Sequence, residues 1–388
     1  MKNFLLSAFF LFFSFNIMSQ EAIWDSPDLK SPEINADNSV IFRLYAPNAT
    51  DVKITGNWME AEGWSPGTVD LTKDDKGIWI YESDPLNSDL YSYSFLVDGV
   101  RVNDPSNVFV VRDVNTLSNI FIIEGKLGDL YSVNDVPQGT VTYRWYFSKG
   151  NDKDRRITVY TPPNYEQSNK SYPVLYLLHG MGGDEEAWSS LGRAAQILDN
   201  LISRGDAEPM IVVMPNGNVA QQAAPGKSQE GLVQPSMSLP NTMDGKREKT
   251  FIDVIEFIEE NYRVKQSASK RAIAGLSMGG FHSLHISRIY PKTFDYVGLF
   301  SAAVFPDESV DSEVYNNFEG ALMQQMENGY ELYYIAMGKE DFLYDQCVEL
   351  RSIMDSIGMS YIYNESDGGH TWSNWRVYLS EFVPMLFK

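Results

Sequence analysis

The chain has 388 residues, of which 43% are hydrophobic and 21% are charged. This composition excludes an intrinsically disordered protein and allows a sizeable core. The formal net charge of −21 at pH 7 disfavours binding to nucleic acid or to anionic membrane surfaces, because like charges repel. The single cysteine, Cys347, excludes an intrachain disulfide and cysteine-rich metal centres.

The first twenty residues have the pattern of a secretory signal peptide. Lys2 is followed by an apolar run from Phe4 to Met18, which is too short to cross a bilayer comfortably, and then by two polar residues. An uncleaved amino-terminal anchor is the alternative. We expect residues 1–20 to be removed and the mature protein to be exported, periplasmic or secreted, without membrane insertion.

Residues 21–129 have the pattern of an all-β domain. Short runs rich in β-branched and aromatic residues occur at 40–47, 51–55, 78–81 and 90–97. Asn, Asp and Gly residues separate these runs, as expected for turns between short strands. The pattern predicts a small β-sandwich, and residues 130–140 are expected to link it to the rest of the chain.

From residue 141 to residue 388 the pattern alternates between strands and helices. Strands are predicted at 156–160, 173–178, 210–214, 271–274, 296–300, 332–336 and 361–363, and helices at 191–203, 251–262, 278–290, 345–357 and 372–386. This alternation predicts an α/β domain whose mostly parallel sheet is covered on both faces. The long segment 217–244 is rich in Gln, Pro, Ser and Met, and loops of this length are usually functional or mobile.

One motif in the second domain has the form of a catalytic nucleophile. Gly275-Leu276-Ser277-Met278-Gly279 lies between a predicted buried strand and a predicted helix, which is the context that gives G-x-S-x-G its meaning. The glycines permit a sharp turn that would present Ser277 at the edge of the sheet, and the following helix supplies free N–H groups. An ordinary strand–helix turn is the alternative.

The base and the acid of a catalytic triad are expected after Ser277 in the chain. His370 lies in a glycine-rich loop between the last predicted strand and the last predicted helix, from which it could reach over the strand ends. Asp341 follows the predicted strand 332–336 and is the candidate acid. Its rivals are Glu340, Asp345 and Asp367.

A second glycine-rich loop, 179–184, follows the predicted buried strand 173–178. The backbone N–H groups of Met181 and Met278 are therefore the candidate oxyanion donors, whereas His179 is expected to support the loop.

Three further residues, Gly180, Trp188 and Trp372, are candidates for lining the substrate pocket, although packing is equally expected for Trp188. His282 and His285 form H-x-x-H on a predicted helix, but without an intervening Glu or an evident third ligand a metal site is not expected. Neither a metal nor an organic cofactor is predicted.

Several of these motifs resemble carbohydrate esterase family one, which includes the feruloyl and acetyl-xylan esterases and is related to enterochelin esterase and S-formylglutathione hydrolase. The resemblance rests on 179–185 with Trp188, 214–217, 275–280, 338–341 and 368–370 with Trp372, and it covers residues 141–388. It implies an α/β-hydrolase fold. Residues 40–47, 95–99 and 103–105 are similar to the early-set β-sandwiches related to family-48 carbohydrate-binding modules.

The sequence therefore predicts a secreted serine esterase that hydrolyses hydroxycinnamoyl, chiefly feruloyl, esters of plant cell-wall polysaccharide or oligosaccharide. The feruloyl assignment depends on apolar residues of the segment 217–244, namely Leu232, Val233, Pro235, Met237 and Leu239, which could cover a phenyl ring. Acetyl-xylan esterase, siderophore esterase and a carbohydrate-binding protein with an inactive hydrolase scaffold are the alternatives. Trp58 and Trp64 could stack on a sugar or pack in the front domain.

Overall fold

A computed structural model describes residues 28–62, 65–220, 237 and 241–388. The expected signal peptide, Trp64 and most of the segment 217–244 lie outside the described residues. No helix in the described part of the chain is long and apolar enough to span a membrane.

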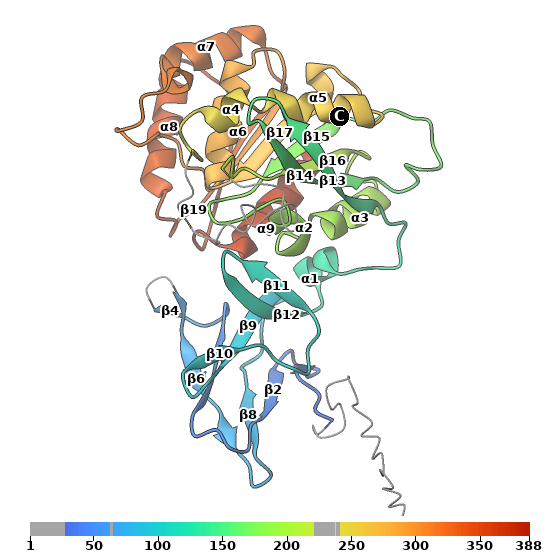
Figure 1. The fold of residues 1–388 in the computed structure, drawn as a ribbon, viewed down its shortest axis with the longest axis vertical. Coiled ribbons are helices and arrows are strands. Elements are labelled where there is room, and N and C mark those ends of the chain that lie inside the picture. Colours follow the sequence, from blue (N-terminus) through green and yellow to red (C-terminus); the bar gives the residue numbers. More distant parts are fainter. Residues whose placement is uncertain (1–27, 63–64, 221–236, 238–240) are drawn as a thin grey trace, which may run out of the picture.

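The front domain consists of antiparallel sheets and lies below the larger domain in Figure 1. One sheet has the strand order β1-β2-β8-β7, and the other has the order β11-β12-β9-β3-β6, with β10 paired to β9. The strands are β1 (Glu33–Ile34), β2 (Val40–Tyr45), β3 (Val52–Gly56), β4 (Ala61–Glu62), β5 (Ser65–Pro66), β6 (Thr68–Asp70), β7 (Thr72–Lys73), β8 (Ile78–Glu82), β9 (Leu90–Val97), β10 (Val100–Val102), β11 (Val110–Asp113) and β12 (Thr116–Ile122). This all-β architecture confirms the predicted sandwich.

An aromatic cluster fills the core of the front domain. Phe42 stacks on Trp58 with ring centroids 5.4 Å apart, and it meets Tyr93 and Phe121 edge-on. A Cβ atom at Gly56 would come within 2.1 Å of the Trp58 ring, so the glycine makes room for the indole. The structure therefore places Trp58 in the packing of the sandwich.

The hairpin of β11 and β12 extends from the front domain to the boundary with the larger domain (Figure 1). Its turn includes Val114 at φ 51°, a conformation that is unusual for a β-branched residue. No strand was predicted here, because the turn lacks the glycine that normally indicates a tight hairpin.

The larger domain is built on an eight-stranded sheet with the order β13-β14-β16-β15-β17-β18-β19-β20. The strands are β13 (Thr140–Ser148), β14 (Lys153–Thr161), β15 (Val174–Leu178), β16 (Ile211–Pro215), β17 (Arg271–Leu276), β18 (Tyr296–Phe300), β19 (Leu332–Gly338) and β20 (Ile362–Ser366). From β16 to β20 all neighbours are parallel, whereas β13 and β14 are antiparallel at one edge. The predicted α/β-hydrolase fold with a mostly parallel sheet is confirmed.

Helices cover both faces of this sheet. They are α1 (Lys126–Tyr131), α2 (Ala187–Ser190), α3 (Ala194–Arg204), α4 (Lys246–Lys249), α5 (Ile252–Asn261), α6 (Met278–Ile289), α7 (Phe318–Asn328), α8 (Tyr344–Ser356) and α9 (Trp372–Phe382), with 3₁₀ turns at Ala268–Lys270, Glu313–Tyr315 and Val383–Met385. Residues of α3 and α9 share one apolar core with the sheet, and residues of α5, α6 and α8 share the other. Successive strand residues alternate between the two cores, as expected for a strand buried on both sides.

The segment predicted as a linker, 130–140, is packed rather than extended between the domains. It contains the end of α1, where Leu130 and Tyr131 are buried. The side-chain amide of Asn200, on α3, donates to the carbonyl oxygens of Leu130 and Ser132 at 2.9 and 3.0 Å. Hydrophobic packing and polar contacts therefore fix this segment against the larger domain.

A buried arginine joins the two domains. Arg376 on α9 has a side chain that is only 1% exposed, and it pairs with Asp89 of the front domain at 3.1 Å. The same guanidinium donates to the carbonyl oxygens of Leu90 and Leu191. Since a buried charge needs several partners to offset its lost hydration, these contacts favour one relative placement of the domains.

Candidate active site

Ser277 occupies a strained turn at the carboxyl end of β17. Its backbone has φ 53° and ψ −118°, and α6 begins at the next residue. Its N–H donates to the carbonyl oxygen of Phe300, at the end of β18, at 2.9 Å. A non-glycine residue in such a conformation costs on the order of 1–3 kcal/mol, and this kind of strain clusters at functional sites.

The flanking glycines are required by close contacts between backbones. A Cβ atom on Gly275 would lie 2.4 Å from the carbonyl carbon of Gly279, and one on Gly279 would lie 2.3 Å from the carbonyl oxygen of Leu178. These contacts bring the start of α6 against the end of β15. The predicted nucleophile turn is therefore present as a strand–turn–helix unit.

His370 and Asp341 form a hydrogen-bonded pair. The Nδ1 atom of His370 lies 2.9 and 3.0 Å from the two carboxylate oxygens of Asp341. The Asp341 side chain is fully buried, whereas that of His370 is 18% exposed, so the imidazole can still be approached. The Leu343 N–H also donates to the Asp341 carboxylate at 2.9 Å, which holds the acid in place.

The sheet topology brings the three candidate residues to one edge. Ser277 follows β17, Asp341 follows β19 and His370 follows β20, and these parallel strands all end at the same side. The Glu340 N–H donates to the carbonyl oxygen of Gly368 at 3.0 Å. This bond ties the acid-bearing turn to the histidine loop.

The rival acids do not contact the histidine. Asp367 has a side chain that is 94% exposed and pairs with Lys339 at 3.0 Å. Asp345 lies in the first turn of α8, and Glu340 is exposed. Among these carboxylates, Asp341 is the one placed to orient His370.

The loop after β15 lies directly beside Ser277. A Cβ atom on Gly180 would lie 3.3 Å from the Cβ atom of Ser277, so the backbone of this loop passes close to the serine. Met181, the next residue, and Met278, at the first position of α6, carry the N–H groups predicted to bind an oxyanion. Their positions on two adjacent turns fit that prediction, which remains to be tested.

His179 supports this loop from within. Its Nε2 atom accepts from the Gly217 N–H at 2.7 Å, so the proton of the neutral ring lies on Nδ1, which is 2.8 Å from the carbonyl oxygen of Gly180. Burial lowers the pKa of His179 to about 4, and the ring is therefore neutral at pH 7. His179 thus connects the loop 179–184 to the start of the segment 217–244.

The two tryptophans predicted near the pocket have different exposures. Trp188 is 1% exposed and donates from its indole to the carbonyl oxygen of Leu178 at 2.9 Å. Trp372 is partly buried and packs edge-on against Trp188 and Trp375, at 5.4 and 5.2 Å. Trp188 therefore belongs to the core and supports Trp372 from below.

The H-x-x-H pair on α6 has other buried partners. The Nδ1 atom of His282 lies 2.7 Å from a carboxylate oxygen of Glu248. His285 lies 3.0 Å from the carbonyl oxygen of Val304 through Nε2 and accepts from Arg288 through Nδ1 at 2.9 Å. These contacts give both rings structural roles within α6 and its neighbours.

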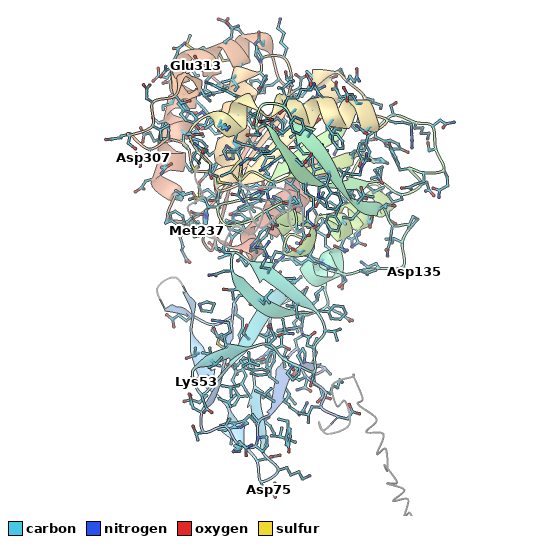
Figure 2. The ribbon with its side chains drawn as sticks, in the orientation of Figure 1. Lys53, Asp75, Asp135, Met237, Asp307 and Glu313 are labelled. Atoms are coloured by element: carbon cyan, nitrogen blue, oxygen red, sulfur yellow. The ribbon has the colours of Figure 1, made fainter. Side chains whose placement is uncertain are left out.

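A cleft of about 530 Å³ opens beside His370, between the two domains. Phe342 covers another side of His370, with ring centroids 4.5 Å apart. Met237, from the segment 217–244, is 56% exposed and lines the cleft, and Figure 2 shows it near the domain boundary. Phe342 and the front-domain residues that line the cleft were not predicted, because none of them belongs to a recognisable motif.

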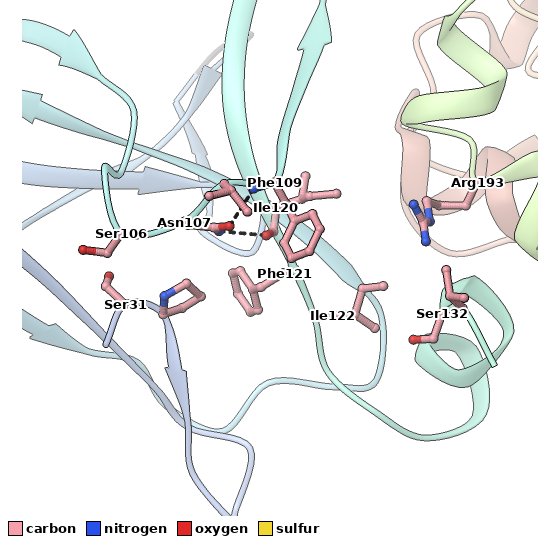
Figure 3. Close-up of a pocket in the computed structure, with 12 residues that line it drawn as sticks. Ser31, Ser106, Asn107, Phe109, Ile120, Phe121, Ile122, Ser132 and Arg193 are labelled. Carbon is pink, nitrogen blue, oxygen red and sulfur yellow. Dashed lines mark hydrogen bonds between the residues drawn. The ribbon is translucent and has the colours of Figure 1, made fainter. Parts of the chain in front are cut away.

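A second cavity, of about 600 Å³, lies on the front domain near α1 and contains none of the candidate catalytic residues. Its walls are mainly apolar, and Figure 3 shows Phe109, Ile120 and Phe121 on one side with Arg193 on the other. Asn107 forms the two hydrogen bonds drawn there, accepting from the Phe109 N–H and donating to the Ile120 carbonyl oxygen.

Comparisons with known proteins agree with this division of the chain. Residues 148–386 match the family described as "Putative esterase", and residues 30–110 match carbohydrate-binding module 48, the isoamylase N-terminal domain. An endo-1,4-beta-xylanase/feruloyl esterase of Xylanibacter ruminicola is 32% identical over 295 residues, which are 74% of this chain and 38% of that protein. The chain spans 38% to 61% of the length of the first three curated relatives that it matches.

Two solved structures extend these similarities. A ferulic acid esterase is 27% identical with a TM-score of 0.52, and the match covers 64% of this chain and 97% of that one. The enterobactin esterase of Shigella flexneri has a TM-score of 0.60 at 15% identity and covers 89% of this chain and 92% of its own, which shows a shared fold across both domains. Because the esterase family model matches more than half of the chain, this protein belongs to that esterase family and carries an N-terminal domain of the module 48 type.

Proposed function

We propose that this protein is an exported serine esterase that releases hydroxycinnamic acids, chiefly ferulic acid, from esters on plant cell-wall polysaccharide or oligosaccharide. The observation that carries the proposal is the edge of the sheet where strained Ser277 and the hydrogen-bonded pair His370–Asp341 follow β17, β19 and β20. The feruloyl assignment is supported by the name of the 32% identical relative.

The reaction begins with attack by the Ser277 hydroxyl oxygen on the ester carbonyl carbon. His370 accepts the hydroxyl proton at Nε2, because Asp341 holds the proton of the ring on Nδ1 and stabilises the imidazolium that forms. Negative charge develops on the carbonyl oxygen and is stabilised by the N–H groups of Met181 and Met278.

The intermediate then breaks the bond to the sugar oxygen. His370 returns its proton to that oxygen, the sugar alcohol leaves, and the acyl group stays on Ser277 as an ester. A water molecule gives a proton to His370 and attacks the acyl carbon. The bond from that carbon to the Ser277 oxygen then breaks, His370 returns the proton to this oxygen, and the acid is released. Every step uses side chains of this protein, backbone N–H groups and water.

A fluorophosphonate probe tests the serine hydrolase class. Covalent labelling of the wild-type protein, and none of the Ser277→Ala variant, is the expected result. Labelling that persists in Ser277→Ala would place the nucleophile elsewhere, and a wild-type protein that is never labelled would favour the inactive carbohydrate-binding scaffold.

A substrate panel tests the acyl group. We expect kcat/KM for methyl ferulate and feruloylated arabinoxylan to exceed that for an aryl acetate or acetylated xylan. The reverse order would favour an acetyl-xylan esterase, and preference for a catechol siderophore ester would favour the enterobactin esterase reaction. Either outcome would contradict the feruloyl assignment and leave the esterase assignment standing.

A further inference from the structure

The cleft beside His370 has one wall from each domain. The wall of the larger domain includes His370, Thr371, Trp372 and Trp375. The front-domain wall includes small polar side chains from three strands and the positions beside them: Thr55, Asn57, Ser92, Ser94, Thr116 and Ser118. An aromatic surface therefore faces a surface of hydroxyl and amide groups.

The polar wall follows from the register of the front-domain sheet. Ser92 and Ser94 are two residues apart on β9, and Thr116 and Ser118 are two residues apart on β12, so each pair lies on one face. The antiparallel pairing of β12 with β9 places Ser92 opposite Ile120 and brings the hydroxyls of Ser94 and Ser118 to 3.5 Å from each other. Thr55 and Ser94 are buried, whereas Asn57, Ser92, Thr116 and Ser118 are exposed or half-buried. The sheet thus holds these four side chains at the cleft, where they can donate and accept hydrogen bonds.

The front domain also contacts the loop predicted to hold the oxyanion. A Cβ atom at Gly182 would lie 2.7 Å from the Val114 side chain and 3.1 Å from the Met237 sulfur atom. The adjacent Arg112 pairs with Asp184 of the same loop. The β11–β12 hairpin therefore packs directly on the loop beside Ser277 and cannot be treated as a remote module.

Two exposed side chains at the cleft, Arg101 and Asn115, have few hydrogen-bond partners among the described residues. Arg101 on β10 lines the cleft, is exposed, and has no ion-pair partner among the described residues. Asn115 is exposed at the hairpin turn and its amide accepts only a 3.5 Å contact from Thr116 within the described part of the chain. Both side chains keep N–H groups available for a bound ligand.

We propose that this cleft binds the sugar chain that carries the ester, with Arg101, Asn115 and Thr116 as specificity-determining residues. The inference rests on the proposed function and deepens it, because it assigns the alcohol side of the ester to the front-domain wall. A sugar ring has hydroxyls that the polar wall matches and an apolar face that Trp372 matches. The cleft volume of about 530 Å³ is typical of small-molecule sites, which span about 300–1,000 Å³.

The test compares cleft variants with matched substitutions elsewhere on the front domain. Arg101→Ala removes a donor, and Thr116→Tyr fills the cleft with a residue that strands tolerate. Lys76→Ala and Thr72→Tyr are the controls, since both positions are exposed and neither lines the cleft. For each protein, kcat/KM is measured on a feruloylated arabinoxylan oligosaccharide and on methyl ferulate.

We expect the ratio of kcat/KM on the oligosaccharide to kcat/KM on methyl ferulate to fall about tenfold in Arg101→Ala, the effect of losing roughly one well-placed hydrogen bond to a charged donor. The ratio should also fall in Thr116→Tyr, whose larger side chain blocks the cleft, and stay at the wild-type value in the controls. Equal changes on both substrates, or no change, would overturn the proposal. Thermal melting identifies a variant that does not fold, and exposed Arg101 leaves a usable test if Thr116→Tyr fails.

Calorimetry separates this inference from the proposed function. Unsubstituted arabinoxylan oligosaccharide is titrated into Ser277→Ala with and without Arg101→Ala. Binding that is weakened by Arg101→Ala supports the sugar site even if the wild-type enzyme does not hydrolyse feruloyl esters. Hydrolysis of methyl ferulate without any oligosaccharide binding would refute the sugar site and leave the esterase intact.

Discussion

The two walls of the interdomain cleft are built in different ways. On the side of the larger domain, His370 lines the cleft and is held by the buried carboxylate of Asp341, and Ser277, at φ 53°, lies at the same edge of the sheet. On the side of the front domain, small hydroxyl residues lie on regular strands, and the unusual φ of 51° belongs to Val114 in the hairpin turn between two of them. We therefore expect chemical reactivity to depend on strained and buried groups, and recognition to depend on the exposed and half-buried groups of a rigid sheet.

Removing the nucleophile should produce the largest loss of activity. Ser277→Ala is expected to lower kcat by about 10⁶-fold, as in serine hydrolases that lose this residue, on methyl ferulate and oligosaccharide alike. The variant should still fold, because alanine keeps the Cβ atom and the same turn. Steady-state kinetics with circular dichroism checks both points, and a folded variant with wild-type turnover would refute the catalytic assignment.

Replacing the buried acid should produce the next largest effect. Asp341→Asn cannot stabilise an imidazolium and favours the wrong tautomer of His370, so a loss of roughly 10⁴-fold in kcat is expected. Asp367→Asn is the matched control, since its carboxylate is 94% exposed and pairs with Lys339 instead. A larger loss in Asp367→Asn would show that the acid has been misassigned.

Adding a methyl group to Gly180 should test whether the position of the loop 179–184 affects kcat. The new Cβ atom of Gly180→Ala would lie 2.5 Å from a Leu276 methyl carbon, so the loop must shift while Ser277 and His370 remain. A displacement of about 1 Å can lower kcat by about 10²-fold. If a crystal structure showed the loop displaced and kcat still stayed within twofold of wild type, the loop would have no part in holding the oxyanion.

The difference between the walls also explains what the sequence could predict. The nucleophile turn requires Gly275 and Gly279, because a Cβ atom on either residue would lie within 2.4 Å of a backbone atom, and this requirement is visible as a motif. His370 and Asp341 follow strands whose apolar runs are equally visible. The positions of these residues were therefore accessible from the pattern of strands and loops.

The front-domain wall of the cleft could not be predicted from a sequence motif. The β11–β12 hairpin turns through Val114 at φ 51°. Its side chain lies against Gly182 of the neighbouring loop, and its carbonyl oxygen accepts from Arg112 at 2.7 Å. Thr116 and Ser118 gain their significance only because β12 pairs with β9 and faces the larger domain. Helix α7 and strand β13 were also not predicted. In β13, however, Val141, Tyr143, Trp145 and Phe147 recur at every second position, which is the period of a strand.

Protonation of His179, which supports the loop beside Ser277, should lower the free energy of unfolding in acid. Its pKa is lowered from an ordinary value of 6.5 to about 4 by burial, so the unfolded chain binds a proton between these values and the folded chain does not. The contribution to stability is present above pH 6.5 and is lost as the pH falls towards 4.

The variant His179→Gln removes this titration while its amide can still accept from Gly217. Chemical denaturation between pH 7 and pH 4 should show a slope of unfolding free energy against pH that is smaller than in wild type, by up to about 1.4 kcal/mol per pH unit. Identical slopes in the two proteins would mean that His179 takes up its proton equally in both states.

The smallest effect is expected at the other cavity of the front domain. Phe109 is 69% exposed and lines the apolar cavity near α1, which contains no candidate catalytic residue. Exposed substitutions usually change stability by less than about 0.5 kcal/mol, and Phe109→Ser touches neither wall of the cleft. Its kcat/KM on methyl ferulate and on feruloylated oligosaccharide should therefore stay within about twofold of wild type. A selective loss on the oligosaccharide as large as that of Arg101→Ala would mean that the sugar chain extends over this cavity, and the recognition surface would then have to be drawn around the whole front domain.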